Sequence, residues 1–233
     1  MPQDFSNCKT TFEKLVLMQH YGIPTRLLDV SMDSLEALFF SLYLDPKSKS
    51  VDFNDSVVLI YEVPKKSILN WHSDKVSIIS NIAVYDYDDL NIKTLPNSAA
   101  DPDREIFNNN ESVKHLLHEI KSEKPHFKDW IKKEDLESIY CVHPLLNNSR
   151  IKAQQGAFLI FGINGDRKHL VTLDSNKGPD IRMTKIFIPQ LAKKRIREEL
   201  KLLGKTVDNV YPDWSGVSDY FERFYEKKLV TLL

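Results

Sequence analysis

The sequence predicts a single α+β domain in which helices flank a mixed or antiparallel central sheet. Strand and helix patterns follow one another irregularly along the 233 residues, whereas a doubly wound fold would alternate them strictly. Hydrophobic residues make up 42% of the chain and charged residues 28%, which is enough apolar material for a buried core. The chain shows no repeat, low-complexity linker or shift of composition. One domain over residues 1–233 is therefore expected.

The helices are predicted from apolar residues at three- and four-residue spacing. Thr10 or Thr11 can cap the first helix, and Gly22 ends it. Pro189 can open a later helix, since the N–H that proline lacks is unpaired at that position anyway, and Gly204 ends that helix. Helices are expected over 11–21, 34–44, 111–123, 190–203 and 215–228, with a shorter one over 127–134.

The strands are predicted from short apolar runs between turn signals. Val57–Val63 is apolar at nearly every position, as in a strand covered on both faces. Ser77–Ile79 and Ile82–Tyr85 could be short strands, whereas Asn97–Asn110 is rich in Asn, Asp and Pro and is expected to be a loop. Asn164-Gly165-Asp166 lies between two apolar runs, which favours a hairpin. The central sheet is expected to contain Val57–Val63, Ser138–Val142, Gly156–Phe161, Lys168–Leu173 and Met183–Ile188.

Composition excludes several classes of function. The net charge is −1, from 32 basic and 33 acidic residues, which argues against a broad nucleic-acid-binding face. Cys8 and Cys141 are too few for a disulfide scaffold and too far apart for a metal knuckle. His115 and His118 have the spacing i, i+3, whereas helical zinc proteases need i, i+4, so no metal is expected. The sequence has no long apolar run and no signal-peptide pattern, so a cytoplasmic protein without membrane contact is expected.

The densest group of polar side chains lies in the segment from Gln19 to Asp29. A helix end, a glycine, a proline turn and a strand start bring His20, Tyr21, Thr25 and Arg26 within a few residues of one another. Arginine has a planar fork of donors that suits phosphate or carboxylate, and histidine titrates near neutral pH. The alternative is structural, with His20 bound to helix carbonyls and Arg26 paired with Asp29 to lock the turn.

A second polar segment runs from Arg150 to Phe158. In an extended conformation, alternation would place Arg150, Gln154 and Gly156 on one face. A glycine within a strand often marks the close approach of a ligand or a second backbone. The alternative is an edge strand with exposed polar residues.

Both segments resemble a known family. His20–Asp29 and the following Leu35–Ser41 look like the core signature of the FRG domain family, and Arg150–Phe158 resembles its second signature, R-I-x-x-Q-x-G-x-F. Tyr211–Gly216 is similar to its closing segment. The Phe/Tyr-Arg-Gly triplet that names the family is not found upstream of the first motif. The resemblance implies one FRG-like domain over 1–233, with core motifs in 12–45, 138–173 and 183–228.

The resemblance also implies a function. FRG proteins occur mainly in bacteria and phages, which suggests a defence or toxin-type system. A more distant resemblance to ADP-ribosyltransferases implies an ADP-ribosyltransferase-like fold, binding of a nucleotide such as NAD, and transfer or hydrolysis of ADP-ribose. Gln154 stands where those enzymes have a carboxylate, and an amide can bind a ribose hydroxyl but cannot stabilise an oxocarbenium-like charge. The alternative is a catalytically silent module that senses a nucleotide or contacts a protein partner.

We expect the two motifs to face each other across one cleft for a phosphorylated ligand. The arginines would hold phosphates, the amide a ribose hydroxyl, and the histidine or tyrosine would act as an acid–base or stacking group. The side-chain tips of Arg26 and Gln154 should then lie within roughly 10–12 Å of each other, about the span of a nucleotide-sized pocket. The candidate catalytic residues are His20, Tyr21 and Gln154, the candidate ligand-binding residues are Thr25, Arg26, Arg150 and Gly156, and Asp29 is assigned to orienting Arg26.

Overall fold

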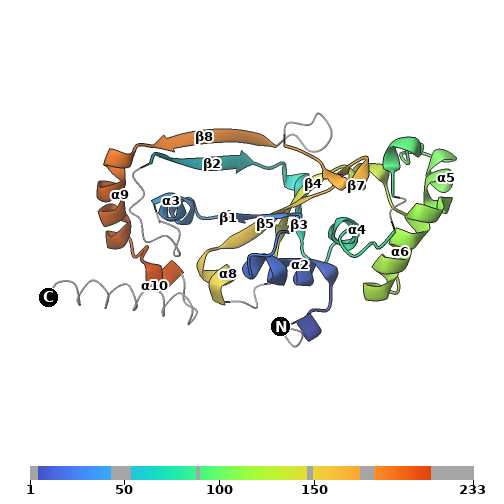
Figure 1. Ribbon diagram of the computed structural model, residues 1–233, viewed down its shortest axis with the longest axis horizontal. Coiled ribbons are helices and arrows are strands. Elements are labelled where there is room, and N and C mark those ends of the chain that lie inside the picture. Colours follow the sequence, from blue (N-terminus) through green and yellow to red (C-terminus); the bar gives the residue numbers. More distant parts are fainter. Residues whose placement is uncertain (1–4, 43–53, 88–89, 146–148, 174–180, 211–233) are drawn as a thin grey trace. The chain divides into compact units, whose positions relative to one another are not determined.

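A computed structural model describes residues 5–42, 54–87, 90–145, 149–173 and 181–210 of the protein (Figure 1). The chain divides into two compact units. Unit 1 comprises Met1–Asp29, Val63–Pro144 and Phe158–Ile181, and unit 2 comprises Val30–Glu62, Leu145–Ala157 and Arg182–Leu233. Both units contain helices and strands, which confirms the α+β class. The single domain over 1–233 stays a prediction, and the expected helix over 215–228 lies outside the described residues.

Most of the four-stranded sheet belongs to unit 1. Its strand order is β1-β5-β4-β3, with β4 antiparallel to β5 and parallel to β3, so the predicted mixed sheet is confirmed. The strands are β1 Leu27–Ser31, β5 Gly156–Phe161, β4 Ile139–His143 and β3 Ile68–Asn70.

Helix α2, Thr11–His20, packs against this sheet (Figure 1). The hydroxyl of Thr10 accepts a hydrogen bond from the Glu13 backbone N–H at 3.2 Å, and the Glu13 carboxylate accepts one from the Thr10 N–H at 2.9 Å. This capping box satisfies N–H groups that a helix start leaves unpaired. The rings of Phe12 and Phe158 meet edge to face with centroids 6.1 Å apart, which joins α2 to β5. The predicted first helix is confirmed.

The remaining helices of unit 1 pack around the core; η1 directly precedes β3 in the sequence, and the others lie between β3 and β4. Helices α5 and α6 lie side by side, as Figure 1 shows in green. The elements are the 3-10 helices η1 Lys65–Ser67 and η2 Ile92–Thr94, and the α-helices α4 Asp74–Asn81, α5 Asp103–Asn109, α6 Glu111–Glu123 and α7 Lys133–Leu136. The largest fully buried core side chains include Phe12, Ile79, Ile82, Tyr85, Leu90, Ile92, Phe107, Leu116, Ile120, Ile131, Leu136 and Leu159.

Four local predictions in unit 1 are wrong. The short strand expected at Ser77–Ile79 lies within helix α4, and Ile82–Tyr85 follows that helix with no strand. Every residue from Val76 to Asn81 is buried, so tertiary packing overrides the β preference of isoleucine. The loop expected at Asn97–Asn110 ends in helix α5. The helix expected over 127–134 starts only at Lys133.

Long-range hydrogen bonds explain why the chain before α7 is not helical. The Asn108 carboxamide accepts a bond from the Ile131 N–H at 2.7 Å, and its NH₂ group donates to the Ile131 carbonyl at 3.0 Å. Both polar groups of the Ile131 backbone are therefore used outside any helix. A sequence pattern cannot indicate such a pairing between residues far apart in the chain.

The predicted turn at Asn164-Gly165-Asp166 is present, but it joins different strands. Gly165 has φ +96°, and it links the short strands β6, Ile163–Asn164, and β7, Asp166–Leu170. Gly162 separates β5 from β6, because its N–H donates to the Ser138 carbonyl at 2.9 Å. A Cβ built at Gly162 would lie 2.1 Å from the Leu136 carbonyl oxygen, so only glycine fits against this backbone.

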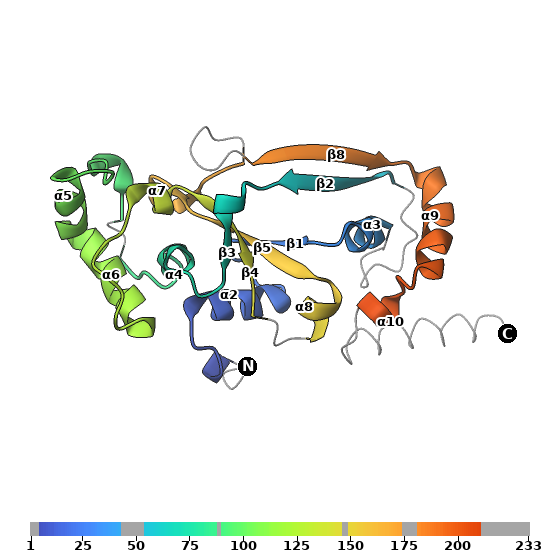
Figure 2. The same ribbon diagram turned by 180° about the vertical axis from the view of Figure 1, so that it is seen from behind.

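Unit 2 consists of a two-stranded ribbon with helices. In the ribbon, β2, Ser56–Glu62, is antiparallel to β8, Arg182–Ile188; Figure 2 shows the two strands side by side. The helices are α3 Ser34–Leu42, α8 Ser149–Ala153, α9 Gln190–Leu202 and α10 Val207–Val210. As predicted, α9 follows Pro189 and is terminated near Gly204, which has φ +76°. The described core of this unit contains Phe39, Leu42, Ile188, Leu200 and Val210.

The ribbon corrects two further expectations. Val57, Leu59 and Ile60 of β2 are each 42% exposed, so the described residues do not cover this strand on both faces. The five strands expected in one central sheet are distributed over three sheets, of four, two and two strands. Apolar content alone does not distinguish a covered strand from one in an exposed ribbon.

Candidate functional site

The turn of the first motif is held by its own side chains. The Thr25 hydroxyl donates a hydrogen bond to the Gln19 side-chain oxygen at 2.7 Å and accepts one from the Leu27 N–H at 3.1 Å. Gly22 has φ +74°, the left-handed conformation that glycine adopts without strain. Thr25 therefore links the end of α2 to the start of β1, which fixes the position of the residues between them.

His20 and Tyr21 lie on the surface at the end of α2. Both side chains are exposed, and their rings meet edge to face with centroids 5.6 Å apart. Tyr21 is the residue after the last helical one, so the tyrosine ring lies beside the turn. Two groups that could transfer a proton or stack on a ring are thus accessible from solvent.

Arg26 is largely buried at the start of β1. Its Nη1 donates to the Phe161 carbonyl oxygen at 3.0 Å, and its own carbonyl accepts a bond from the Phe161 N–H at 3.1 Å. Burial, together with the nearby charge of Arg167, lowers the pKa of the Arg26 guanidinium to about 10. The fold therefore holds this cation in a place that disfavours its charge.

Arg167 is the residue of this site that the sequence analysis missed. It lies on β7, and its Nη1 donates to the carbonyl oxygens of Tyr85 and Tyr87, the latter at 3.4 Å. Within the described part of the chain, neither Arg26 nor Arg167 forms an ion pair with a carboxylate. The only sequence signal was the charged run Asp166-Arg167-Lys168-His169 directly after the predicted turn.

The second motif does not form the expected extended segment. Arg150 and Gln154 belong to helix α8 and the turn after it, and β5 begins only at Gly156. Gln155 has φ +45°, so the backbone reverses direction at that residue. The predicted alternation of Arg150, Gln154 and Gly156 on one strand face is therefore wrong.

Gln154 forms contacts at both its side chain and its backbone. Its Nε2 donates to the Val210 carbonyl at 3.1 Å, and its own carbonyl accepts a bond from the Ser31 hydroxyl at 2.8 Å. The amide thus connects the turn after α8 to α10. A Cβ built at Gly156 would lie 3.6 Å from the nearest atoms of Ile151, which is ordinary contact, so no described protein atom requires glycine there.

The two motifs fall in different units. His20, Tyr21, Thr25 and Arg26 belong to unit 1, and Arg150, Gln154 and Gly156 belong to unit 2. The common cleft, and a distance of roughly 10–12 Å between Arg26 and Gln154, stay predictions. The assignment of Asp29 to orienting Arg26 also stays a prediction; the guanidinium donates to the Phe161 carbonyl oxygen.

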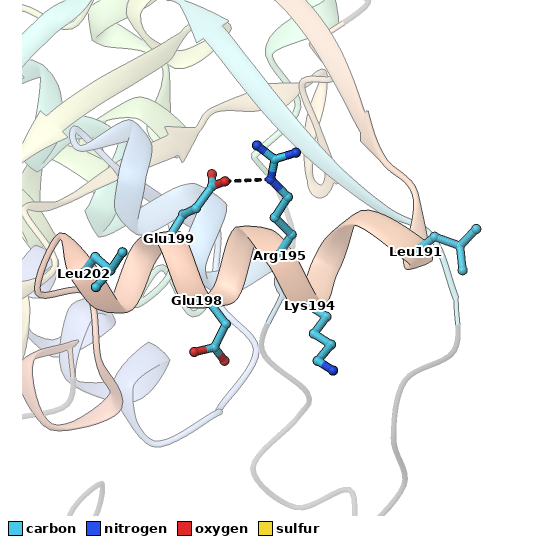
Figure 3. Close-up of a pocket in the computed structure, with 6 residues that line it drawn as sticks. All are labelled: Leu191, Lys194, Arg195, Glu198, Glu199 and Leu202. Carbon is cyan, nitrogen blue, oxygen red and sulfur yellow. Dashed lines mark hydrogen bonds and ion pairs between the residues drawn. The ribbon is translucent and has the colours of Figure 1, made fainter.

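A surface hollow of about 470 Å³ lies on the outer side of α9 (Figure 3). Arg195 donates to Glu199 at 2.8 Å within it, and Leu191 and Leu202 are almost fully exposed. Its described lining residues all belong to this one helix and to neither motif; they are Leu191, Lys194, Arg195, Glu198, Glu199 and Leu202. The hollow therefore adds nothing to the candidate site.

No three His, Cys, Asp or Glu side chains in the described part of the chain come together in a group that could hold a metal ion. None of the helices described combines the length and the apolar character needed to cross a bilayer.

In the comparison with known proteins, one family model matches part of the chain. The model of the FRG domain matches residues 2–50, which confirms the resemblance predicted from the first motif. The second motif, at residues 150–158, lies outside the matched segment. No curated protein and no solved structure matches the chain.

Proposed function

We propose that the protein binds a phosphorylated, nucleotide-like ligand at the first motif, with Arg26 and Arg167 facing its phosphates. The observation that supports this is the pair of guanidinium groups: the charge of Arg167 contributes to lowering the pKa of Arg26, and neither group has a carboxylate partner among the described residues. An anion between them would offset the unfavourable burial of the Arg26 charge and would accept charge-assisted hydrogen bonds. The exposed His20 and Tyr21 lie beside the same turn.

The ligand proposed is NAD or a related nucleotide, and the setting is a cytoplasmic defence or toxin-type system of a bacterium or phage. In the enzyme form of the proposal, His20 or Tyr21 acts as the acid–base group in transfer or hydrolysis of ADP-ribose, and Gln154 binds a ribose hydroxyl. Such a reaction needs stabilisation of positive charge on the ribose, for which a carboxylate is the suitable group.

One observation favours the second candidate, a catalytically silent module that binds a nucleotide and acts through a protein partner. The Gln154 amide donates to the Val210 carbonyl, so a group expected to contact the ribose has a structural partner within its own unit. In this candidate, the ligand still binds at Arg26 and Arg167, but the protein catalyses no reaction on it.

Titration calorimetry with ADP and with NAD tests the binding site. We expect saturable binding by the wild type and a loss of at least about tenfold in affinity in Arg26→Met and Arg167→Met, since each removes a charged hydrogen-bond donor worth roughly 1.5–3 kcal/mol. Arg195→Met is the matched control, because Arg195 lies on α9 and pairs with Glu199. Unchanged affinity in both variants, or no binding of either nucleotide to the wild type, would refute the site.

Release of nicotinamide from NAD separates the two candidates. An enzyme should release nicotinamide, and His20→Ala should abolish the release while leaving the melting temperature unchanged, because His20 is exposed. Saturable binding without release identifies the binding module. Release that survives both His20→Ala and Tyr21→Phe would remove these two residues from the mechanism.

A further inference from the structure

Three aromatic rings of unit 1 lie in contact close to Arg167. Tyr85 is buried, and its ring centroid lies 5.4 Å from that of Tyr87 at an interplanar angle of 58°. Tyr87 also stacks on His115 of α6, with centroids 4.0 Å apart and an angle of 13°. Tyr87 itself is 46% exposed. Its ring is thus supported by two neighbours and still offers surface to solvent.

Arg167 connects these rings to the anion site. The same guanidinium that lowers the pKa of Arg26 donates to the carbonyls of Tyr85 and Tyr87. The backbone of Tyr87, which carries the exposed ring, is therefore hydrogen-bonded directly to Arg167. Positive charge and an accessible aromatic ring then lie within the dimensions of a single nucleotide.

We propose that Tyr87 is the stacking surface for the base of a nucleotide whose phosphates lie at Arg26 and Arg167. The inference rests on the function proposed above and specifies its ligand class: a phosphorylated compound with a planar aromatic ring, as opposed to phosphate or diphosphate alone. Stacking of a base on an aromatic side chain contributes binding energy without reading the base sequence, since every base has a π-face. The support from Tyr85 and His115 holds the tyrosine ring in place before the ligand arrives, which lowers the entropic cost of binding.

The structural alternative is that the Tyr87–His115 stack only packs α6 against the chain that precedes η2. That role needs the two rings but gives no reason for a nucleotide to bind more tightly than diphosphate. The two readings therefore differ in the ligand selectivity of a Tyr87 variant.

The test compares ADP with inorganic diphosphate by titration calorimetry on the full chain. The wild type should bind ADP more tightly than diphosphate. Tyr87→Leu should weaken ADP binding by about tenfold, from the roughly 1–3 kcal/mol of a base–aromatic stack, and leave diphosphate binding unchanged. Tyr87→Phe should bind ADP as the wild type does. Trp130→Leu is the matched control, since Trp130 is an equally exposed ring that packs on Arg104 elsewhere in unit 1.

The outcomes separate this inference from the proposed function. If Arg26→Met loses ADP binding while Tyr87→Leu keeps it, the anion site stands and the stacking surface is overturned. If Tyr87→Leu weakens ADP and diphosphate equally, the substitution acts through Arg167, and the stacking surface is again overturned. If Tyr21→Leu weakens ADP selectively and Tyr87→Leu does not, the base lies at the turn of the first motif. If the wild type binds neither compound, the proposed function fails and this inference with it.

Discussion

Different interactions stabilise each of the two units of the chain. In unit 1, side chains from α2, α4, α6 and the four-stranded sheet form one continuous apolar core, and many of them are less than 2% exposed. In unit 2, the described apolar core is confined to Phe39, Leu42, Ile188, Leu200 and Val210, while the ribbon exposes Leu59 and Phe187.

Unit 2 also contains an ion cluster. The Lys205 ammonium group lies 2.6 Å from a carboxylate oxygen of Asp33 and 2.6 Å from one of Glu36. Glu36 is 2% exposed, and its second oxygen has no hydrogen-bond partner among the described groups. The difference teaches that packing stabilises unit 1, whereas a few apolar side chains and a buried charge cluster stabilise unit 2. Stability of unit 2 should therefore depend more strongly on pH.

The largest expected loss of stability comes from a substitution in the core of unit 1. Phe12→Ala removes a ring that is 2% exposed and meets Phe158 edge to face, and it should lower the free energy of unfolding by about 3–5 kcal/mol. Phe39→Ala in unit 2 should cost less, since fewer neighbours surround the cavity. Urea unfolding of both variants checks this, with the exposed Ile106→Ala as the control. An equal loss in Phe12→Ala and Phe39→Ala would contradict the comparison.

The next effect concerns the ion cluster of unit 2. Lys205→Met leaves the buried Glu36 without its cation and should cost about 3 kcal/mol. Lys75→Met in unit 1 is the matched control: Asp135 loses Lys75 at 3.0 Å but keeps the Tyr140 hydroxyl at 2.8 Å, so the cost should be smaller. Chemical unfolding of the two variants measures the difference. A greater loss in Lys75→Met would show that the charge cluster is not what distinguishes unit 2.

The pH dependence of the same cluster follows from its pKa shifts. The bond from Lys205 lowers the pKa of Asp33, so this stabilisation is present above the unfolded pKa of 3.8 and is lost as the pH falls through the lower folded value. The carboxylates raise the pKa of Lys205, although burial opposes them, so this stabilisation is present below 10.5 and is lost at higher pH. Lys205→Met should therefore differ from the wild type at neutral pH and approach it at both extremes. A constant difference across the pH range would contradict this linkage.

Local signals in the sequence were enough to predict some elements and not others. The α2 helix, with its Thr10 cap and its end at Gly22, depends on contacts within a few residues, and so does α9 between Pro189 and Gly204. Helix α4 could not be predicted, because its Ile and Val residues favour strands in isolation and only their burial makes them helical.

The candidate site shows the same division between local and long-range information. The turn that carries residues 20–26 could be predicted, since a glycine, a proline and a threonine specify it locally. Arg167 could not, because its relation to Arg26 and to Tyr85 joins residues far apart in the chain. Gln154 was placed on a strand because its neighbours alternate, whereas α8 and the positive φ of Gln155 place it at a turn.

Alanine substitutions at two glycines, one in each unit, should change the stability by smaller amounts. Gly162→Ala places a Cβ against the Leu136 carbonyl and should lower the free energy of unfolding of unit 1 by about 1–3 kcal/mol. Gly156→Ala meets only ordinary contacts in unit 2 and should change the stability by less than about 0.5 kcal/mol. Thermal unfolding measures both variants. If Gly156→Ala keeps its stability but loses nucleotide binding, the predicted role of Gly156 beside a ligand gains support; a large loss of stability would show a structural role instead.

The last prediction concerns Arg26, a partly buried cation of unit 1 that forms no ion pair with a described residue. Arg26→Met loses a hydrogen bond to the Phe161 carbonyl, worth about 1 kcal/mol. It also removes the unfavourable free energy of burying the guanidinium charge. The two effects oppose each other, so the free energy of unfolding near neutral pH should stay within about 1 kcal/mol of the wild type. The folded-state pKa of Arg26 is about 10, below its value in the unfolded chain, so the charged form is disfavoured in the fold and the wild type gains stability as the pH rises from about 10. Arg26→Met should lack this gain, which urea unfolding of both proteins at neutral pH and near pH 10.5 would measure. A loss of several kcal/mol at neutral pH would identify Arg26 as a structural residue of the β1–β5 contact, and it would count against a guanidinium kept for an anionic ligand.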